Sequence, residues 1–224
     1  MPVRILYCDN HLVVCEKPIG VSSESPGLPD LVSAQEGFPV FPVHRLDRTT
    51  GGACILARSA QACAALQRLF RQDCITKEYL AVVSGVPETP AGTYTDLLYH
   101  DQRTNRSFVV DRQRKGVREA RCEWRVLETA ETPEGLMSLV RVCLHTGRTH
   151  QIRVQFASRR MPLAGDRRYG SRIKAEAPAL WSAQIRFAHP FAAGETVDLV
   201  SAPPAVFPWS CFAGTDAALP CSAE

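Results

Sequence analysis

Short apolar runs, separated by turn residues, recur along this chain and constrain its fold more than any other feature. The first two runs, residues 3–10 and 11–17, meet at Asp9–Asn10 and predict a hairpin. Further strands are predicted at residues 54–58, 75–85, 93–99, 138–146, 185–190 and 195–202. Helices are predicted at residues 60–72, after an N-capping Ser59, and at residues 149–161, starting from an N-capping Thr149. Because strands predominate without regular strand–helix alternation, the sequence predicts an α+β fold.

The segments between these elements carry further expectations. Residues 18–42 are rich in Pro, Gly and Ser and are expected to form a loop. Residues 101–125 alternate charged and apolar residues and are expected to form a pair of edge strands with a basic outer face. The length of 224 residues fits a single domain, 1–224. Its core is expected at about residues 3–200, and the tail after about Trp209 is expected to be loose.

The composition excludes several classes of protein. Hydrophobic residues make up 45% of the chain and charged residues 22%, as in a globular protein with its own core. No uncharged apolar run approaches the roughly 18 residues of a membrane span, and the first residues lack the pattern of a signal peptide. The nine cysteines form no C-x-x-C pair, so neither disulfides nor a structural zinc site is expected. These features predict a protein of the reducing cytoplasm.

The positive charge is concentrated in the middle of the sequence. The net charge is +3, but residues 1–44 carry −3 and residues 176–224 carry −4, which leaves +10 for residues 45–175. Arginine accounts for 22 of the 26 basic residues. A GC-rich genome would explain the preference for Arg over Lys, but not the position of the charge. Since guanidinium groups bind phosphate and stack on bases, nucleic acid is the expected partner.

One aspartate, Asp47, lies among His44, Arg45 and Arg48, directly before Thr49–Thr50 and two glycines. Opposite charges nearby favour the ionised carboxylate. An ionised carboxylate suits a nucleophile or an electrostatic catalyst and argues against a general acid. The glycines would allow the backbone to approach a ligand closely. The alternative interpretation is a solvated basic turn with an incidental acid.

A second basic cluster lies at residues 144–172, where Asp166 is the single acid. Its arginines are Arg148, Arg153, Arg159, Arg160, Arg167, Arg168 and Arg172. On a helix starting at Thr149, Arg153 and Phe156 would share a face with Thr149, which would direct Arg153 toward a pocket. The alternative is a basic helix that faces solvent. Tyr79, in the predicted strand 75–85, is a third candidate, although a tyrosine there is more often part of the core.

Taken in this order, these segments resemble the RluA-type pseudouridine synthases. The matching segments are ILYCDNHLVVCEKPIGV, HRLDRTTGGACILARS, KEYLAVVSG, LHTGRTHQIRVQFASRRMPLAGDRRYG and FAHP. The resemblance implies a mixed, largely antiparallel sheet with flanking helices and a central basic cleft. It also implies that the chain isomerises uridine to pseudouridine in RNA, with no cofactor and no metal.

The resemblance implies roles for individual residues. Asp47 would be the catalytic aspartate, either attacking the sugar or assisting elimination to a glycal-like intermediate. Tyr79 would pack on the target base and is a candidate for proton removal, and Arg153 would pair with Asp47. The expected RNA contacts are His44, Arg45, Arg48, Lys77, Arg148, His150, Gln151 and Arg167. The chain departs from the family pattern at Thr50, where Ser is usual, and at Gln155, where His is usual, which bears on the choice of substrate.

The expected partner is ribosomal or transfer RNA that presents a flipped uridine to a monomeric protein, with no DNA and no membrane. Two rival functions remain. In an aspartyl-phosphate phosphotransferase, Asp47 would accept a phosphoryl group with magnesium, but Thr49 stands where a second Asp is common. In a catalytically inactive RNA-binding relative, the fold would persist without the chemistry. The presence of Asp47, Tyr79 and Arg153 argues against this second rival.

Overall fold

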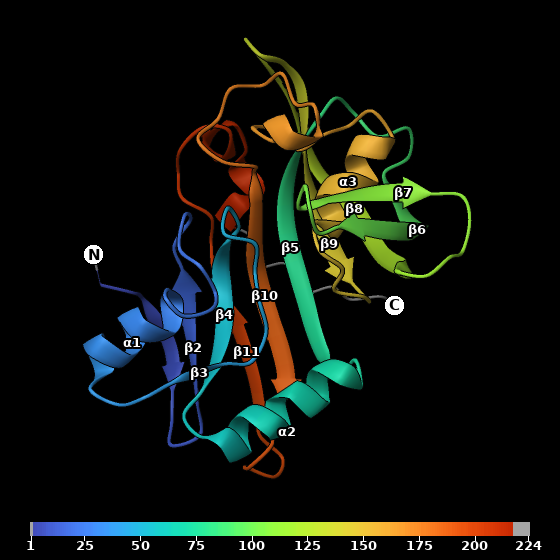
Figure 1. Cartoon of the computed structure of the whole chain (residues 1–224). Coiled ribbons are helices and arrows are strands. Elements are labelled where there is room, and N and C mark those ends of the chain that lie inside the picture. Colours follow the sequence, from blue (N-terminus) through green and yellow to red (C-terminus); the bar gives the residue numbers. More distant parts are fainter. Residues whose placement is uncertain (1, 217–224) are drawn as a thin grey trace.

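One eleven-stranded sheet runs through the molecule in the computed structural model, which describes residues 2–216 (Figure 1). In chain order the strands are β1 Ile5–Cys8, β2 Leu12–Lys17, β3 Phe41–Pro42, β4 Gly51–Ala57, β5 Ile75–Ser84, β6 Ala91–Asp101, β7 Arg106–Val110, β8 Val117–Thr132, β9 Gly135–Leu144, β10 Leu180–Ala188 and β11 Thr196–Val200. Across the sheet they follow the order β1-β2-β4-β10-β5-β9-β8-β6-β7, with β3 beside β4 and β11 beside β10. All of these pairs are antiparallel except β4 with β10. The α+β fold with a mixed, largely antiparallel sheet is therefore confirmed.

Three α-helices lie against the sheet in the described part of the chain. They are α1 Leu28–Glu36, α2 Ala60–Arg71 and α3 Gln151–Ser158, and short 3-10 turns occupy Arg167–Tyr169, Trp209–Cys211 and Ala213–Asp216. The predicted cap of α2 is confirmed, because Ser59 Oγ accepts a hydrogen bond from the backbone N–H of Ala62 at 3.1 Å.

Helix α1 corrects the expectation of a loop at residues 18–42. Pro29 stands in its first turn, and Asp30 accepts the backbone N–H of Gly27 at 2.7 Å, which together start a helix. Leu28 and Val32 on its inner face are fully buried in the core. The helix is thus stabilised by packing, which outweighs the loop-like composition of the segment.

Helix α3 begins later than predicted. His150 has a left-handed backbone conformation (φ 56°), so Gln151 is the first helical residue and Thr149 is not an N-cap. Thr149 therefore does not share a helical face with Arg153 and Phe156. Phe156 is fully buried in the core, whereas Arg153 forms ion pairs with carboxylates outside the helix.

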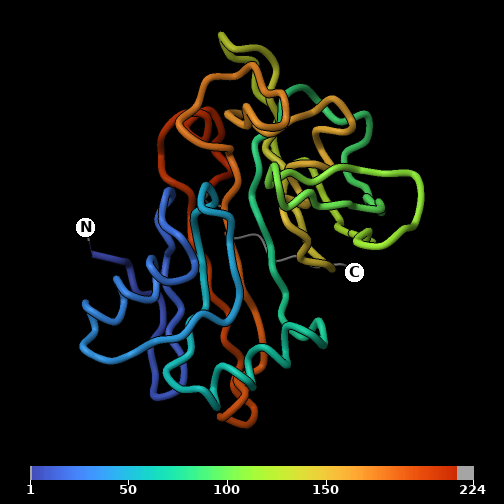
Figure 2. The backbone as a smooth tube through the Cα atoms, in the orientation of Figure 1, coloured from blue at the N-terminus to red at the C-terminus, as the bar shows by residue number. Residues whose placement is uncertain are grey.

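We call residues 101–118 the basic hairpin. They comprise the β6–β7 turn, strand β7 and the connection to the start of β8. Its exposed cations are Arg103, Arg106, Arg112, Arg114, Lys115 and Arg118, and its acids are Asp101 and Asp111. The sequence analysis expected a pair of edge strands here. Only β7 is at the edge, since β8 lies between β9 and β6. Figure 2 shows the basic hairpin at the right of the molecule, away from α2 at the bottom.

The chain after Trp209 is packed as far as Gly214, which corrects the expectation of a loose tail there. Trp209 and Phe212 are 4% and 5% exposed and belong to the same apolar cluster as Trp181. The backbone N–H of Gly214 donates to Glu128 Oε2 at 3.0 Å. The rest of the expected tail, residues 217–224, lies outside the described residues.

Three further properties hold for residues 2–216. No helix in this range is long and apolar enough to cross a membrane. No three side chains of His, Cys, Asp or Glu in it are arranged so as to hold a metal ion. The cysteines of the same range are all free thiols.

Candidate active site

Asp47 lies in the loop between β3 and β4, at a turn closed by a hydrogen bond from the backbone N–H of Thr50 to the Asp47 carbonyl at 2.9 Å. Gly51 follows this turn because no side chain fits there: a Cβ would lie 2.2 Å from the Trp181 ring. Gly52 has φ +105°, and a Cβ on it would lie 2.3 Å from the Ser182 carbonyl oxygen. The two glycines thus allow β4 to pair with β10 and hold Asp47 beside that junction.

Lys17, at the end of β2, holds the loop that carries Asp47 in place. Its side chain is fully buried, and Nζ donates to the carbonyls of Pro18, Val21 and Arg48 at 2.9, 2.8 and 3.4 Å. Burial lowers the pKa of Lys17 to about 8. Arg48, expected to contact RNA, is exposed and donates from Nε to the Gly20 carbonyl at 2.6 Å. These bonds tie residues 17–21 to the loop that carries Asp47.

Arg153 reaches Asp47 from α3 and confirms the predicted pair. Arg153 Nη1 lies 3.4 Å from Asp47 Oδ2, while Nε and Nη2 donate to Asp166 Oδ2 and Oδ1 at 2.6 and 2.9 Å. Arg153 and Asp166 are 4% and 1% exposed. Burial acts to lower the pKa of Arg153, but the hydrogen bonds and charge of Asp166, together with the charge of Asp47, raise it overall. A fixed cation therefore stands beside Asp47.

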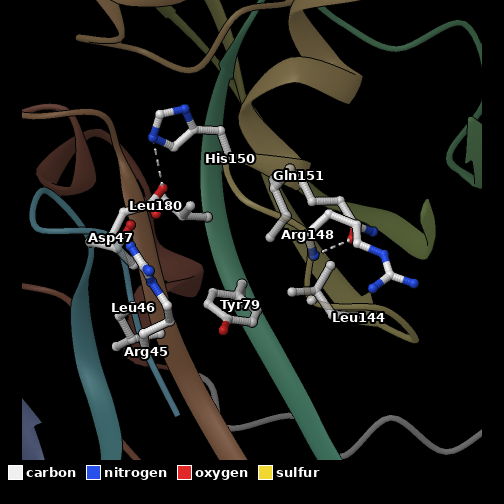
Figure 3. A pocket seen from close by; sticks show the side chains of 12 residues that line it. Arg45, Leu46, Asp47, Tyr79, Leu144, Arg148, His150, Gln151 and Leu180 are labelled. Carbon is white, nitrogen blue, oxygen red and sulfur yellow. Dashed lines mark hydrogen bonds and ion pairs between the residues drawn. The ribbon is translucent and has the colours of Figure 1, made fainter. Parts of the chain in front are cut away.

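His150 also faces Asp47, with Nε2 3.6 Å from Oδ2 (Figure 3). Its other ring nitrogen, Nδ1, is 2.9 Å from the hydroxyl of Tyr169. Burial lowers the pKa of His150 to about 4, which outweighs the opposite effect of Asp47. His150 is therefore neutral at pH 7, and its role differs from that of a cationic phosphate ligand.

Tyr79 projects from β5 into the middle of the site, between Asp47 and Leu144 in Figure 3. It is 8% exposed, and burial, with a further contribution from the charge of Asp47, raises its pKa well above the ordinary value. Tyr79 therefore keeps its proton at neutral pH. In the free protein this argues for a ring surface and a hydroxyl donor rather than a phenolate base.

These side chains surround a small open cavity of about 80 Å³. Its lining residues are Arg45, Leu46, Asp47, Thr50, Tyr79, Leu144, Gly147, Arg148, His150, Gln151, Ile152 and Leu180. The exposed Arg45 and Arg148 stand at its rim, and Gln151 holds the rim by donating from Nε2 to the Arg121 carbonyl at 3.1 Å. A cavity lined by both apolar and polar side chains, with a carboxylate and cations among them, suits a planar base attached to a sugar phosphate.

The structure places His44, Lys77 and Arg167, all expected RNA contacts, outside this cavity. His44 Nε2 accepts the backbone N–H of Ile55 at 2.9 Å, and its ring stacks on Phe70 at 4.6 Å. Burial lowers the pKa of His44 to about 3, and the ring packs between β4 and α2. Lys77 pairs with Asp73 at 3.5 Å and lies 5.7 Å from the Phe70 ring, and Arg167 is exposed on its 3-10 turn.

Three functional candidates were missed from the sequence: Lys17, Asp166 and Tyr169. Asp166 carried a signal, since it is the single acid in a stretch with seven arginines. Lys17 and Tyr169 carried none, because only tertiary packing brings them to the site. Gln155, where the sequence departs from the family pattern, lies away from the cavity and donates from Nε2 to Asp96 Oδ2 at 2.8 Å.

Comparison with known proteins was consistent across sequence and structure. Residues 11–158 match the family model described as RNA pseudouridylate synthase. An uncharacterized RNA pseudouridine synthase of Aquifex aeolicus is 36% identical over 76% of this chain and 57% of its own length. Ribosomal large subunit pseudouridine synthase D of Nitrosomonas europaea is 35% identical over 76% of this chain and 50% of its own length. tRNA pseudouridine synthase C of Vibrio cholerae is 29% identical over 84% of this chain and 86% of its own length.

The fold has a counterpart among solved structures. Human RNA Pseudouridylate Synthase Domain Containing 1 superposes with a TM-score of 0.79 at 23% identity, covering 92% of this chain and 85% of that chain. At this identity the likeness concerns the fold alone. The chain spans little more than half the length of the Aquifex relative and half that of the Nitrosomonas relative.

Proposed function

The chain belongs to the RNA pseudouridylate synthase family, and within it to the RluA type, and on this basis we propose that it converts uridine to pseudouridine in RNA. The observation that supports this most is the arrangement around Asp47. Its carboxylate faces the cavity with Arg153 Nη1 at 3.4 Å and the Tyr79 ring beside it. One carboxylate, one fixed cation and one aromatic surface are the groups that this reaction needs.

The reaction rearranges one nucleoside. The N1–C1′ bond of the uridine breaks, the uracil turns, and a C5–C1′ bond forms. The C5 proton passes to solvent and N1 gains a proton, so substrate and product have the same atoms. The chemistry therefore calls for no oxidant, reductant or cofactor.

Asp47 is the proposed catalytic residue. Its carboxylate acts on the sugar, either by attack at C1′ or by assisting elimination to a glycal-like intermediate. Arg153 balances the charge of Asp47 and, held by Asp166 on its other side, cannot turn away to solvent. Tyr79 packs on the uracil and keeps it in the cavity while it turns.

The proposed substrate is RNA with a uridine that leaves its stack, which costs a few kcal/mol and favours loops and single strands. Relatives are named for ribosomal RNA and for transfer RNA, so both are candidates. Arg45 and Arg148 at the rim, with the basic hairpin beyond, are proposed to hold the phosphates. The proposed setting is the cytoplasm, and a monomer is proposed because one chain supplies the whole site.

Release of tritium from RNA labelled at C5 of uridine tests this proposal. The wild type and Asp47→Asn, which keeps the shape of the side chain, are compared in EDTA on separate ribosomal and transfer RNA fractions from a strain that lacks the gene. We expect release by the wild type alone, and the responding fraction identifies the substrate. No release even with magnesium, together with magnesium-dependent transfer of phosphate to Asp47, would favour the phosphotransferase rival. RNA binding by both proteins without turnover would favour the inactive RNA-binding relative.

A further inference from the structure

His150 is more buried than a simple RNA contact requires. It is 8% exposed and neutral, and it lies between Asp47 and Tyr169. Its left-handed backbone (φ 56°) is uncommon for a residue with a side chain, and such conformations often occur where geometry serves function. The contacts of its two ring nitrogens define what it does.

A directed chain of hydrogen bonds reaches His150 from one side. The backbone N–H of Ser107 donates to the Tyr169 hydroxyl oxygen at 2.9 Å, a direction that is fixed because an amide N–H only donates. Burial raises the pKa of Tyr169, so the hydroxyl keeps its own proton. The Ser107 side chain also lies near this hydroxyl, but its Oγ donates to the Thr149 carbonyl, and the short 2.9 Å contact with His150 Nδ1 is where we place the Tyr169 proton. Nδ1 is then an acceptor, and the neutral ring carries its proton on Nε2.

The other side of the ring fits the same tautomer. Nε2 lies 3.6 Å from Asp47 Oδ2, and a carboxylate only accepts, so an N–H at this position is favourable and a lone pair is not. In structures without substrate, catalytic hydrogen bonds are often this long and tighten in the complex. Arg153 Nη1 contacts the same oxygen, Oδ2, at 3.4 Å. The nearest contact of each donor is thus to the same oxygen of Asp47, Oδ2, and not to Oδ1.

We propose that Tyr169 and His150 are positioning residues: by fixing the Nε2–H tautomer of His150, they hold Oδ2 of Asp47 against Arg153 and leave Oδ1 for the sugar of the substrate. This inference rests on the proposed function. It assigns a task to Tyr169, which the RluA-type resemblance left without one. Among the charged groups nearest His150, Arg153 and Arg168 lower its pKa, whereas Asp47 and Asp166 raise it. Burial outweighs the two carboxylates, so the ring stays neutral.

The chain of hydrogen bonds that leads to His150 begins in the basic hairpin. Ser107 belongs to β7, and besides its N–H bond to Tyr169 its Oγ donates to the Thr149 carbonyl at 2.5 Å. The edge strand is therefore bonded to the residue before His150 and to the residue that orients its ring. RNA bound to the basic hairpin would therefore affect the same hydrogen bonds that orient Asp47.

The tautomer of His150 is measured without any activity assay. In uniformly ¹⁵N-labelled wild type at pH 7, long-range ¹⁵N–¹H correlations of the imidazole rings distinguish the two neutral tautomers and the imidazolium for the six histidines. His150→Gln assigns the His150 signals by their loss. We expect the Nε2–H tautomer. An Nδ1–H tautomer or an imidazolium at pH 7 overturns the proposal.

The consequence for turnover is measured with Tyr169→Phe, which removes the hydroxyl and keeps the ring between Arg106 and Arg153. We expect kcat for tritium release to fall about tenfold, because His150 Nδ1 loses its donor in a buried site, while KM stays within about twofold. Tyr7→Phe on β1, which removes a hydroxyl that donates to Asp9, is the matched control and leaves kcat unchanged. A Tyr169→Phe kcat within about twofold of wild type overturns the inference.

A conservative pair separates positioning from packing. His150→Gln keeps an N–H donor that extends about as far as Nε2, whereas His150→Ala keeps none. Both variants must adopt the same left-handed backbone conformation at residue 150. We expect the Gln variant to retain about tenfold more kcat than the Ala variant. Equal losses would mean that only packing matters and would overturn the inference. A wild type that turns over no RNA would overturn the proposed function itself, whereas an active wild type with unaffected variants overturns this inference alone.

Discussion

Asp166 holds the guanidinium of Arg153 through two hydrogen bonds, Nε to Oδ2 at 2.6 Å and Nη2 to Oδ1 at 2.9 Å. This bidentate grip leaves Nη1 as the group that faces Asp47 at 3.4 Å. All three side chains are largely enclosed by protein, with exposed side-chain fractions of 19% for Asp47, 5% for Arg153 and 1% for Asp166. The direction of Arg153 toward Asp47 is therefore set from behind, by a residue that does not line the cavity.

Asp166→Asn is expected to weaken both stability and turnover. The variant keeps the size of the side chain but leaves Arg153 with a neutral partner in a buried site. Since breaking a buried ion pair costs about 3–5 kcal/mol, we expect the free energy of unfolding in urea to fall by about 3 kcal/mol. We expect kcat to fall about 100-fold, because Arg153 is then free to turn from Asp47.

Asp198→Asn is the matched control for Asp166→Asn. Its partner Arg186 lies 3.8 Å away, and the two side chains are 42% and 61% exposed. An exposed pair of this kind contributes about 0–1 kcal/mol, so stability and turnover should be close to those of wild type. Equal losses in the two variants would show that the burial of the Arg153–Asp166 pair has no special role.

Much of the fold and part of the site follow from local sequence signals. Alternating apolar runs predict the strands, because side chains of a strand alternate between faces. The cap of α2 is equally local, since Ser59 bonds a residue three positions ahead. Asp47 stands out by its charged neighbours in sequence. Its pairing with Arg153, 106 residues away, came from the family resemblance and not from any local pattern.

The rest depends on packing that no local pattern reports. His44 is close to Asp47 in sequence, yet it packs against Phe70 of α2 and bonds the backbone of β4. Asp166 looks like a lone acid in a basic stretch until the fold sets it against Arg153. From the sequence, Lys17 looks like an ordinary charged residue at the end of a strand. In the fold, its ammonium group is enclosed by three backbone carbonyls. His44 and Asp166 find their partners in another element, and Lys17 reaches Arg48 in the Asp47 loop besides its neighbours Pro18 and Val21, so these assignments require the tertiary fold.

Acid is expected to destabilise the protein through His44. Its pKa is about 3 in the folded protein and about 6.5 in the unfolded chain, so the unfolded chain binds more protons between these values. The stability it contributes is present above about pH 6.5 and is lost as the pH falls toward 3. We expect His44→Gln, whose amide oxygen replaces Nε2 as acceptor, to lose about 1–2 kcal/mol less than wild type between pH 7 and pH 5 in urea unfolding. Parallel curves would contradict this.

Gly51→Ala is expected to displace the loop that carries Asp47. The new Cβ would lie 2.2 Å from the Trp181 ring, and that ring is buried and bonded through Nε1 to Ser201. We expect a loss of about 1–3 kcal/mol in the free energy of unfolding and a fall in kcat. Gly214→Ala is the control, because its Cβ would make an ordinary contact at 3.5 Å with Glu128. Retention of full activity by Gly51→Ala would mean that β4 and β10 adjust without moving Asp47.

The basic hairpin combines charge with aromatic surfaces. Arg114 lies 5.0 Å from the Tyr99 ring, and Arg106 lies 5.4 Å from the ring of Phe108, which is 40% exposed. Cations interleaved with exposed aromatic rings favour single-stranded nucleic acid, because phosphates and bases both find partners. Arg148 at the rim of the cavity donates from Nε to the carbonyl of Glu119, the residue that follows the hairpin in β8, at 3.0 Å.

Neutralising Arg112 and Arg114 together, as Arg112→Gln/Arg114→Gln, is expected to weaken RNA binding in a salt-dependent way. Each phosphate contact contributes about 0.7 to the slope of log affinity against log salt for single strands, so the slope should fall by about 1.4. KM should rise while kcat changes little, because neither residue touches Asp47. Arg68→Gln/Arg71→Gln on α2 removes the same charge at the far end of the molecule (Figure 2). Equal slopes for the two double variants would show that RNA binding senses net charge alone and not this surface.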